Sequence, residues 1–156
     1  MRLMIAAVGR LRGGPEADLT AEYLARIGPA GRGIGLGPAE LKEVEARTAG
    51  DREREAELLL ALAPEGARRV LLDETGEAWP SRRWARKLGA WRDEGVPAAV
   101  FFIGGPDGAS ERIRAGAAHT LAFGPQTWPH RLVRVMLAEQ LYRAVTILCG
   151  SPYHRD

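Results

Sequence analysis

The sequence contains a single cysteine, Cys149, among its 156 residues. One cysteine cannot form an internal disulfide, which argues against a disulfide-stabilised secreted domain. An uninterrupted apolar run of about 18 residues, as a membrane-spanning helix requires, is also missing. The apolar start at residues 3–8 is too short for a signal peptide, and the charged Arg10 and Arg12 follow at once. We therefore expect a cytoplasmic protein in which residues 3–8 form a buried strand.

Asparagine is absent and lysine occurs only twice, so nearly all of the positive charge is carried by arginine. The 22 basic and 20 acidic residues give a formal net charge of +2. Arginine makes bidentate contacts with phosphate groups, which fits an RNA-binding protein. A GC-rich genome or a thermophilic source produces the same bias, and net charge alone does not establish nucleic-acid binding.

Several common enzyme signatures are missing as well. The chain has no G-x-x-x-x-G-K-[ST] phosphate loop, no G-x-S-x-G nucleophile elbow and, at Gly28–Pro38, no G-x-G-x-x-G dinucleotide fingerprint. His119, His130 and His154 do not have zinc-ligand spacing with Cys149, so we expect no metal site. Cys149 ends an apolar helix, where a small buried residue is more common than a nucleophile.

The apolar residues that are present alternate between short runs and helical spacing. They make up 46% of the chain, enough for the core of a single domain over residues 1–156. The pattern predicts strands near 3–8, 69–73, 98–103 and 120–123, and helices near 18–27, 51–63, 81–95, 110–116 and 132–148. Such alternation is typical of an α/β fold with a mostly parallel sheet flanked by helices.

Local signals mark the expected ends of these elements. Residues that can cap the starts of three helices are Asp18, Ser81, and Thr127 or Trp128. The strand at 69–73 is expected to end in a turn at Glu74–Gly76. The glycine-rich segment Gly28–Pro38 is expected to be a loop with a weak edge strand.

The predicted last helix, residues 132–148, has apolar residues on nearly every side. Such a helix is buried all round, and a dimer interface explains this better than the interior of one small domain. Four polar residues are embedded in it: Arg134, Glu139, Gln140 and Arg143. Because a buried charge requires a partner or a function, we expect Arg134 to pair with Glu139 within the helix or across a dimer.

Three loops lie where ligands bind in open α/β sheets, beyond the carboxyl ends of the strands. They are the loop after Leu72, the glycine loop Gly104–Gly108 and the segment Phe123–Trp128. Glycine allows a ligand to approach the backbone closely, although a tight turn explains the same residues. The terminal residues 151–156 combine Tyr, His and Arg, which suit a flipped RNA base, although chain ends are often frayed.

Several segments, in this order and spacing, carry a resemblance to a known family. They are Phe101–Gly108, Pro129–Val135, Glu139–Ala144 and Pro152–Arg155, together with Ala7–Gly9 and Leu72–Asp73. The sequence resembles the ribosomal RNA large subunit methyltransferase H family, the 23S rRNA pseudouridine N3-methyltransferases, over essentially its whole length. The segment Gly28–Pro38 departs, being richer in glycine than the strand the family has there, and Gln126 and Trp128 match the cofactor loop less closely than its other residues.

The resemblance implies a SPOUT-type α/β fold with a carboxyl-terminal trefoil knot, a homodimer, and S-adenosylmethionine bound in the knot. A knot is too rare to be predicted from pattern alone. The implied cofactor-binding positions fall in the same three loops: Leu72, Gly104, Phe123, Gly124, Pro125, Gln126, Thr127 and Trp128.

The implied substrate is a pseudouridine in the helix 69 loop of 23S rRNA, within the assembled 70S ribosome. We hypothesise that His154 accepts or relays the N3 proton and that Tyr153 positions the base. Arg143 would stabilise the negative charge that develops on the ring. The tail that carries Tyr153 and His154 can serve its own active site or that of a partner subunit, and both arrangements fit the sequence.

Two other functions fit parts of the sequence. A SPOUT methyltransferase acting on tRNA or on a ribose hydroxyl shares the cofactor loops and differs in its substrate. The second alternative is a non-enzymatic, ribosome-associated binding module with a degenerate pocket. The intact Gly104–Gly105 loop and the Tyr153–His154 pair argue against this second function.

Overall fold

A computed structural model of the chain describes residues 1–155. Its elements follow in the order β1 (Arg2–Val8), α1 (Pro15–Gly31), the 3-10 helix η1 (Arg32–Ile34), β2 (Ala39–Val44), α2 (Arg52–Leu62), β3 (Arg68–Ala78), α3 (Ser81–Asp93), β4 (Ala98–Ile103), α4 (Glu111–Gly116), β5 (His119–Ala122) and α5 (His130–Leu148). Within residues 1–155, none of these helices combines the length and the apolar character that crossing a membrane requires.

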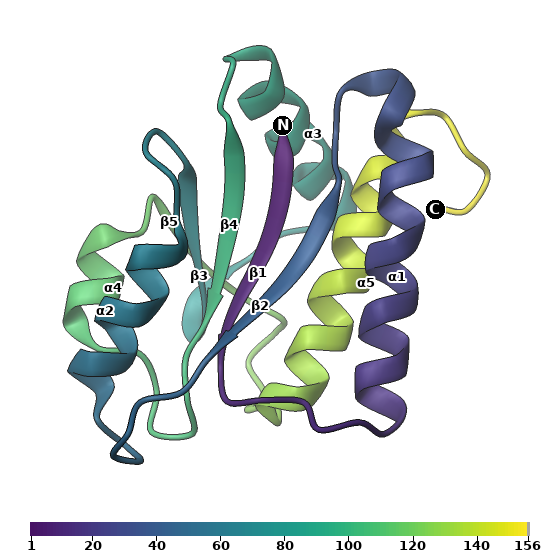
Figure 1. Cartoon of the computed structure of the whole chain (residues 1–156). Helices are drawn as coiled ribbons and strands as arrows, with labels where there is room; N and C mark the ends of the chain where they lie inside the picture. Colours follow the sequence, from purple (N-terminus) through teal and green to yellow (C-terminus); the bar gives the residue numbers. More distant parts are fainter. Residues whose placement is uncertain (156) are drawn as a thin grey trace.

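Within the described residues, five strands form one sheet in the order β2-β1-β4-β3-β5, and all neighbouring pairs are parallel. Helices α1, α5 and α3 cover one face of the sheet, and α2 and α4 cover the other (Figure 1). The predicted α/β fold, with a parallel sheet flanked by helices, is therefore confirmed.

Strands β1 and β4 are buried along almost their whole length, because helices cover both faces of the sheet. Successive side chains point to opposite faces. Leu3 and Ile5 of β1 thus join the core beneath α1, α3 and α5, whereas Met4 and Ala6 join the core beneath α2 and α4. Burial on both faces explains why these strands are continuous apolar runs in the sequence.

Helix α5 packs against both α1 and α3 on the same face of the sheet. Its residues Leu137 and Leu141 are fully buried, whereas Leu132 is 40% exposed and Val135 and Met136 are half-buried. The chain by itself therefore buries one side of α5 only, and the predicted burial on all sides at a dimer interface stays a prediction. Cys149, expected to be buried at the end of this helix, is exposed.

The predicted helix caps are wrong: Asp18, Ser81, and Thr127 or Trp128. A proline stands at or directly before the first residue of each of these helices instead. Pro15 is the first residue of α1, Pro80 occupies the capping position of α3, and Pro129 occupies that of α5. Proline suits a helix start, because its φ is already helical and the N–H that it lacks has no partner there.

The glycine-rich segment Gly28–Pro38 is only partly a loop. Helix α1 continues through Pro29 to Gly31, and η1 follows directly. Ile27, one residue before the segment, is fully buried against the core shared with α5. This packing overrides the weak helix propensity of glycine and proline. The edge strand β2 begins after the segment, at Ala39.

Strand β3 continues past its predicted end. Leu72 and Glu77 both pair with Leu121 of β5, so residues 73–76 bulge out of the ladder between them. A Cβ on Gly76 would lie 2.5 Å from the backbone of Leu121, so only glycine fits at this close approach. The predicted turn is therefore a bulge within a strand rather than the end of one.

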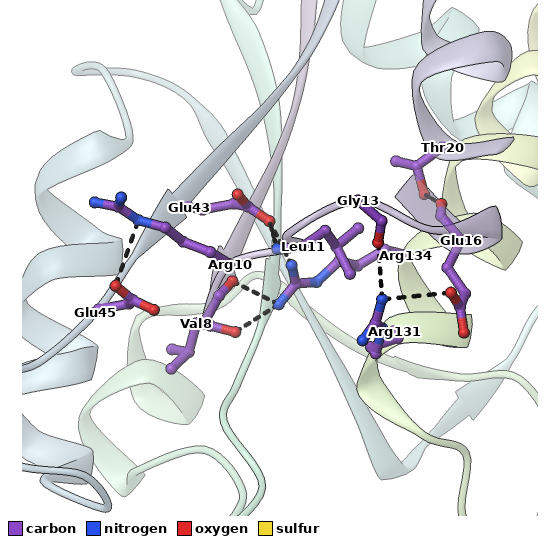
Figure 2. A network of polar contacts seen from close by, with 11 residues as sticks. Val8, Arg10, Leu11, Gly13, Glu16, Thr20, Glu43, Glu45, Arg131 and Arg134 are labelled. Carbon is purple, nitrogen blue, oxygen red and sulfur yellow. Dashed lines mark hydrogen bonds and ion pairs between the residues drawn. The ribbon is translucent and has the colours of Figure 1, made fainter. Parts of the chain in front are cut away.

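Arg134 of α5 is 1% exposed and joins the last helix to the first two strands. Its guanidinium donates to Oε1 of Glu43 at 2.5 Å and to the carbonyl oxygens of Val8 and Gly9 at 2.6 and 2.8 Å (Figure 2). The same carboxylate oxygen accepts the backbone N–H of Leu11 at 2.8 Å. One buried arginine thus holds together α5, the ends of β1 and β2, and the loop after β1.

The predicted pairing of Arg134 with Glu139 is wrong, because Glu139 binds Arg143 one turn further along the helix. The partner of Arg134 comes from β2, a part of the chain that is 91 residues away in the sequence. The Nε atom of Arg134 is buried without a hydrogen-bond partner in the described part of the chain.

Replacing Arg134 by alanine should lower the free energy of unfolding by about 3–5 kcal/mol, because the partly buried Glu43 carboxylate loses its counter-charge. Urea unfolding followed by circular dichroism measures this effect. Arg131→Ala is the matched control. Arg131 is 44% exposed and bonds to the Gly13 carbonyl, so its loss should change stability by less than about 1 kcal/mol. Equal effects of the two substitutions would contradict the prediction.

Candidate functional site

A cavity of about 450 Å³ opens at the carboxyl edge of the sheet, beside the start of α5. The β3 bulge, the loop after β4 and the loop after β5 surround it, as the parallel topology requires. The structure brings all the predicted cofactor positions to this cavity except Pro125, which is exposed and does not line it. The volume lies within the range of small-molecule sites.

The β3 bulge is held by the carboxylate of Asp73. This group accepts the N–H and the hydroxyl of Thr75 at 3.0 and 2.6 Å, and Arg114 of α4 donates to it at 2.7 Å. Burial raises the pKa of this carboxyl, but the hydrogen bonds from Arg114 and Thr75 outweigh burial, and the pKa lies below its ordinary value. Asp73 is therefore ionised at neutral pH and ties the bulge to α4.

The loop after β5 is tied to the same bulge. Thr127 donates its hydroxyl to the carboxylate of Glu74 at 2.7 Å. The indole N–H of Trp128 donates to the carbonyl of Phe123 at 3.1 Å, and the ring is 39% exposed. These bonds give the mouth of the cavity a defined shape, with an aromatic surface at its rim.

The start of the loop after β4, at Gly104, lies close to the backbone at the end of the same loop. A Cβ on Gly104 would lie 3.2 to 3.3 Å from backbone atoms of residues 108–109, tighter than most real contacts. Gly105 packs against the carboxylate of Glu55, which would lie 3.1 Å from a Cβ there. Burial and the neighbouring aspartates raise the pKa of Glu55. The two glycines thus allow a compact loop whose backbone faces the cavity.

The cavity wall combines apolar and polar groups. Leu72 before the β3 bulge, Ile103 at the end of β4 and Leu121 of β5 form buried apolar parts of it. His130 lines it at the start of α5, and burial, followed by the charges of Arg134 and Arg131, lowers the pKa of this imidazole. The group is therefore neutral at pH 7. Within residues 1–155, no cluster of three or more His, Cys, Asp or Glu residues suited to a metal ion is found.

The predicted catalytic residues lie together at the other end of α5. Tyr153 donates its hydroxyl to Oε1 of Glu139 at 3.0 Å, and Nε of Arg143 donates to the same oxygen at 2.9 Å. Nη1 of Arg143 lies 3.3 Å from Nδ1 of His154, and its guanidinium stands 4.9 Å from the centre of the Tyr153 ring. Glu139 thus anchors the tail to α5. Asp156 lies outside the described residues.

Burial and hydrogen bonds raise the pKa of two of these groups, Tyr153 and Arg143. Burial, together with hydrogen bonds to Tyr23 and Glu139, raises the pKa of the Tyr153 hydroxyl well above its ordinary value. The hydrogen bond with Glu139 likewise raises the pKa of Arg143. Tyr153 therefore remains a neutral donor and Arg143 remains a cation at neutral pH. Glu139 thus accepts hydrogen bonds from two groups that both keep their protons.

The two predicted groups of site residues are separated by the length of α5. The helix spans 19 residues, which corresponds to about 28 Å. His130, its first residue, lines the cavity, and the tail follows its last residue (Figure 1). Tyr153 and His154 accordingly do not line the cavity of their own chain.

Two parts of the site were missed in the sequence. Asp73 carries a visible signal, since it is an acidic residue directly after a buried strand. Arg114 gives no signal in the sequence. It lies 41 residues from Asp73 along the chain, and only the packing of α4 on the sheet brings the two together. Glu139 is visible in the sequence as a charge embedded in an apolar helix, but its contact with the tail depends on how the chain folds back after α5.

Comparisons with known proteins agree with this architecture. The profile of a family described as "Predicted SPOUT methyltransferase" matches residues 1–154. The chain is 54% identical to a ribosomal RNA large subunit methyltransferase H from Hyphomonas neptunium, over 99% of both chains. It is 53% identical to a protein of the same name from Paracoccus denitrificans, over 100% of both.

A solved structure supports the fold independently. The chain is similar to a probable methylase family protein from Haemophilus influenzae with a TM-score of 0.52. The two are 12% identical, and the likeness covers 99% of this chain and 70% of the other.

Asp73→Asn should lower the free energy of unfolding at pH 7 by about 1–3 kcal/mol, because Arg114 loses a charged acceptor. The pKa of Asp73 is lower in the folded chain than its ordinary 3.8, so the ionised form stabilises the fold. The difference between the two proteins should be constant above pH 5 or so and should shrink as the pH falls through about 4 and below. Urea unfolding from pH 7 to pH 3 measures it. A difference that does not depend on pH would contradict this role of the carboxylate.

Proposed function

The chain belongs to the SPOUT methyltransferase family and, within it, to the ribosomal RNA large subunit methyltransferase H family, and we propose that it methylates N3 of a pseudouridine in the helix 69 loop of 23S rRNA. The family resemblance found in the sequence is confirmed, and the protein is a methyltransferase. The finer proposal is that S-adenosylmethionine is the donor and the assembled 70S ribosome the acceptor, in the cytoplasm. The proposal rests on the full-length sequence identity of 53–54% to proteins named rRNA methyltransferases, together with the cavity that the predicted loops surround.

The cavity fits S-adenosylmethionine in size and character. Leu72 and Leu121 offer apolar contacts to the adenine ring, and the backbone of the Gly104 and Phe123–Trp128 loops offers hydrogen-bonding groups. A side chain at Gly104 would press on the backbone of residues 108–109, so glycine there keeps compact the loop that lines the cavity. Asp73 and Glu74 at the rim are acidic, which suits a cationic cofactor. The trefoil knot implied by the family belongs to the same proposal.

S-adenosylmethionine, when bound, supplies a methyl group that is already activated on a sulfonium. The residues of the chain have two remaining tasks, to hold the base in line and to remove the N3 proton. His154 accepts that proton. Tyr153, held by Glu139 as a neutral hydrogen-bond donor, presents its ring and hydroxyl to position the base. Arg143, kept charged by Glu139, stabilises negative charge on the ring.

The separation along α5 supports an active site that two subunits share. In a two-fold dimer that pairs the α5 helices in opposite directions, the start of one helix lies beside the end of the other. The exposed Leu132 and the half-buried Val135 and Met136 supply an apolar surface for such pairing. The tail of one subunit would then reach the cavity of its partner, across a distance that it does not bridge within its own chain.

The purified protein should transfer a labelled methyl group from S-adenosylmethionine to 70S ribosomes that lack the modification. Mass mapping should place the label on a helix 69 pseudouridine, with less transfer to isolated 50S subunits and least to protein-free 23S rRNA. The ranking is expected because a small chain with little net charge depends on the shape of the assembled ribosome. Label on tRNA or on a ribose hydroxyl, with none on helix 69, would replace the proposed substrate.

His154→Ala should reduce turnover about 10²–10⁴-fold and leave the affinity for S-adenosylmethionine unchanged, because it removes the proton acceptor and not the cavity. Gly104→Val should abolish cofactor binding and leave the tail intact. If the active site is shared, mixing the two variants restores about a quarter of wild-type activity, because half of the dimers are mixed and each has one intact site.

Thermal unfolding of each variant checks that both remain folded, and each variant mixed with itself is the control. No recovery in the mixture, although native mass spectrometry shows mixed dimers, would assign the tail to the cavity of its own chain. Unchanged turnover in His154→Ala would remove this residue from the mechanism.

A further inference from the structure

The net positive charge of the chain comes from one segment. Residues 79–92 hold five of the 22 basic residues and none of the 20 acidic ones. The rest of the sequence therefore carries 17 basic and 20 acidic residues, a net charge of −3. The formal net charge of +2 thus conceals one strongly basic segment on an otherwise slightly acidic protein.

Residues 81–92 of this segment form helix α3 up to its last residue, the acidic Asp93, and four of its cations share the outer face of the helix. Trp84, Leu88 and Trp91 point inward and are buried in the core. The outer face carries Arg82, Arg83, Arg86 and Lys87 over little more than one turn, and these are exposed or half-buried. We call these four residues the basic face of α3.

Aromatic rings beneath this face support some of its side chains. The guanidinium of Arg83 lies 4.9 Å and the ammonium of Lys87 lies 5.9 Å from the centre of the Trp79 ring. Arg68 of β3 extends the positive surface and lies 5.8 Å from the Trp91 ring. Such contacts restrict the side chains before a ligand binds, which reduces the entropy lost on binding.

Nearby carboxylates neutralise only part of this charge. Glu77 pairs with Arg83, and Glu94 pairs with Arg68. Among residues 1–155, neither Arg86 nor Lys87 has an acidic partner within ion-pair distance. The face also lacks an apolar centre, since the large exposed hydrophobic side chains of the described chain lie on α1, on α5 and in the loop before α5. A charged face without an apolar centre is unlike a typical protein–protein interface and suits a polyanion.

The basic face lies toward the tail end of the molecule. Helix α3 packs along α5, and a Cβ on Gly89 would lie 3.3 Å from the side chain of Leu148, the last residue of α5. Tyr153 and His154 follow within six residues. An RNA strand whose base reaches these two residues would therefore have phosphates near α3.

We propose that the basic face of α3 binds the phosphate backbone of ribosomal RNA beside the target base. The inference rests on the proposed function, because it places this surface next to a tail that contacts the base. Its contribution is electrostatic and independent of base sequence, since each arginine or lysine that neutralises a phosphate releases a counterion. The surface thereby supplies RNA affinity to a chain with a low net charge.

The test is the double variant Arg86→Glu/Lys87→Glu, assayed on 70S ribosomes with saturating S-adenosylmethionine. The KM for ribosomes should rise on the order of tenfold or more at low salt, and kcat should stay within about twofold. The slope of log(kcat/KM) against log salt should become shallower by about 1.4–1.8, as expected when two phosphate contacts are lost. Affinity for the cofactor should not change.

Arg54→Glu/Arg112→Glu is the matched control. It makes the same change of charge on α2 and α4, which cover the opposite face of the sheet, and it should leave KM and the salt slope as in the wild type. Arg86→Gln, which alters one exposed side chain, provides a milder variant if the double variant unfolds, and Arg86→Lys should retain most of the affinity. A KM and salt slope equal to those of the wild type would overturn the proposal.

Direct binding separates this inference from the proposed function. If the wild type binds RNA but methylates no ribosomal particle, the proposed substrate fails, and filter binding to protein-free 23S rRNA then decides the role of α3. Weaker and less salt-dependent binding by the double variant supports it, and equal binding overturns it. Weaker binding to 70S particles with unchanged binding to protein-free rRNA would also overturn it, in favour of an acidic ribosomal protein.

Discussion

The buried contact of Arg134 with Glu43 and with the carbonyl oxygens at the end of β1 is the interaction on which the cavity end of the molecule depends. A guanidinium leaves water only where its N–H groups find partners, so α5 has one position along the sheet at which this side chain is satisfied. That position also places His130 and Val133 on the wall of the cavity. A shift of α5 would leave the arginine unpaired and would change the shape of the cavity with it.

Helix α5 also relates the separate parts of the proposed active site to one another. Its first turn closes the cavity, its middle carries Glu139 and Arg143, and the tail follows its end (Figure 1). A continuous helix keeps its two ends apart, and this rigidity is the physical reason for proposing that the subunits exchange tails. Helix α5 carries the apolar side that the chain leaves uncovered, and it packs against α3, which carries the basic face. Dimerisation and RNA binding would therefore be organised around one helix.

Sequence-based prediction succeeded where a local pattern was sufficient and failed where packing decided. Strands 3–8 and 98–103 were predicted because burial on both faces makes them apolar throughout. The convergence of the three loops followed from the parallel order alone, although Pro125 within them is exposed and does not line the cavity. The extension of α1 to Gly31 was not predicted, because glycine and proline are poor helix formers and only the contact with the core overrides their preference.

The sequence by itself determined the fold class, the family and the loops that form the cavity, because hydrophobic period, glycine position and ordered motifs are properties of short segments. The tertiary structure alone decided which polar groups meet. Arg134 meets Glu43 across 91 residues and Asp73 meets Arg114 across 41, while the tail lies away from the cavity of its own chain. Such pairs arise from the distances between packed elements, and a buried charge in the sequence shows that a partner is needed without showing which one the fold supplies.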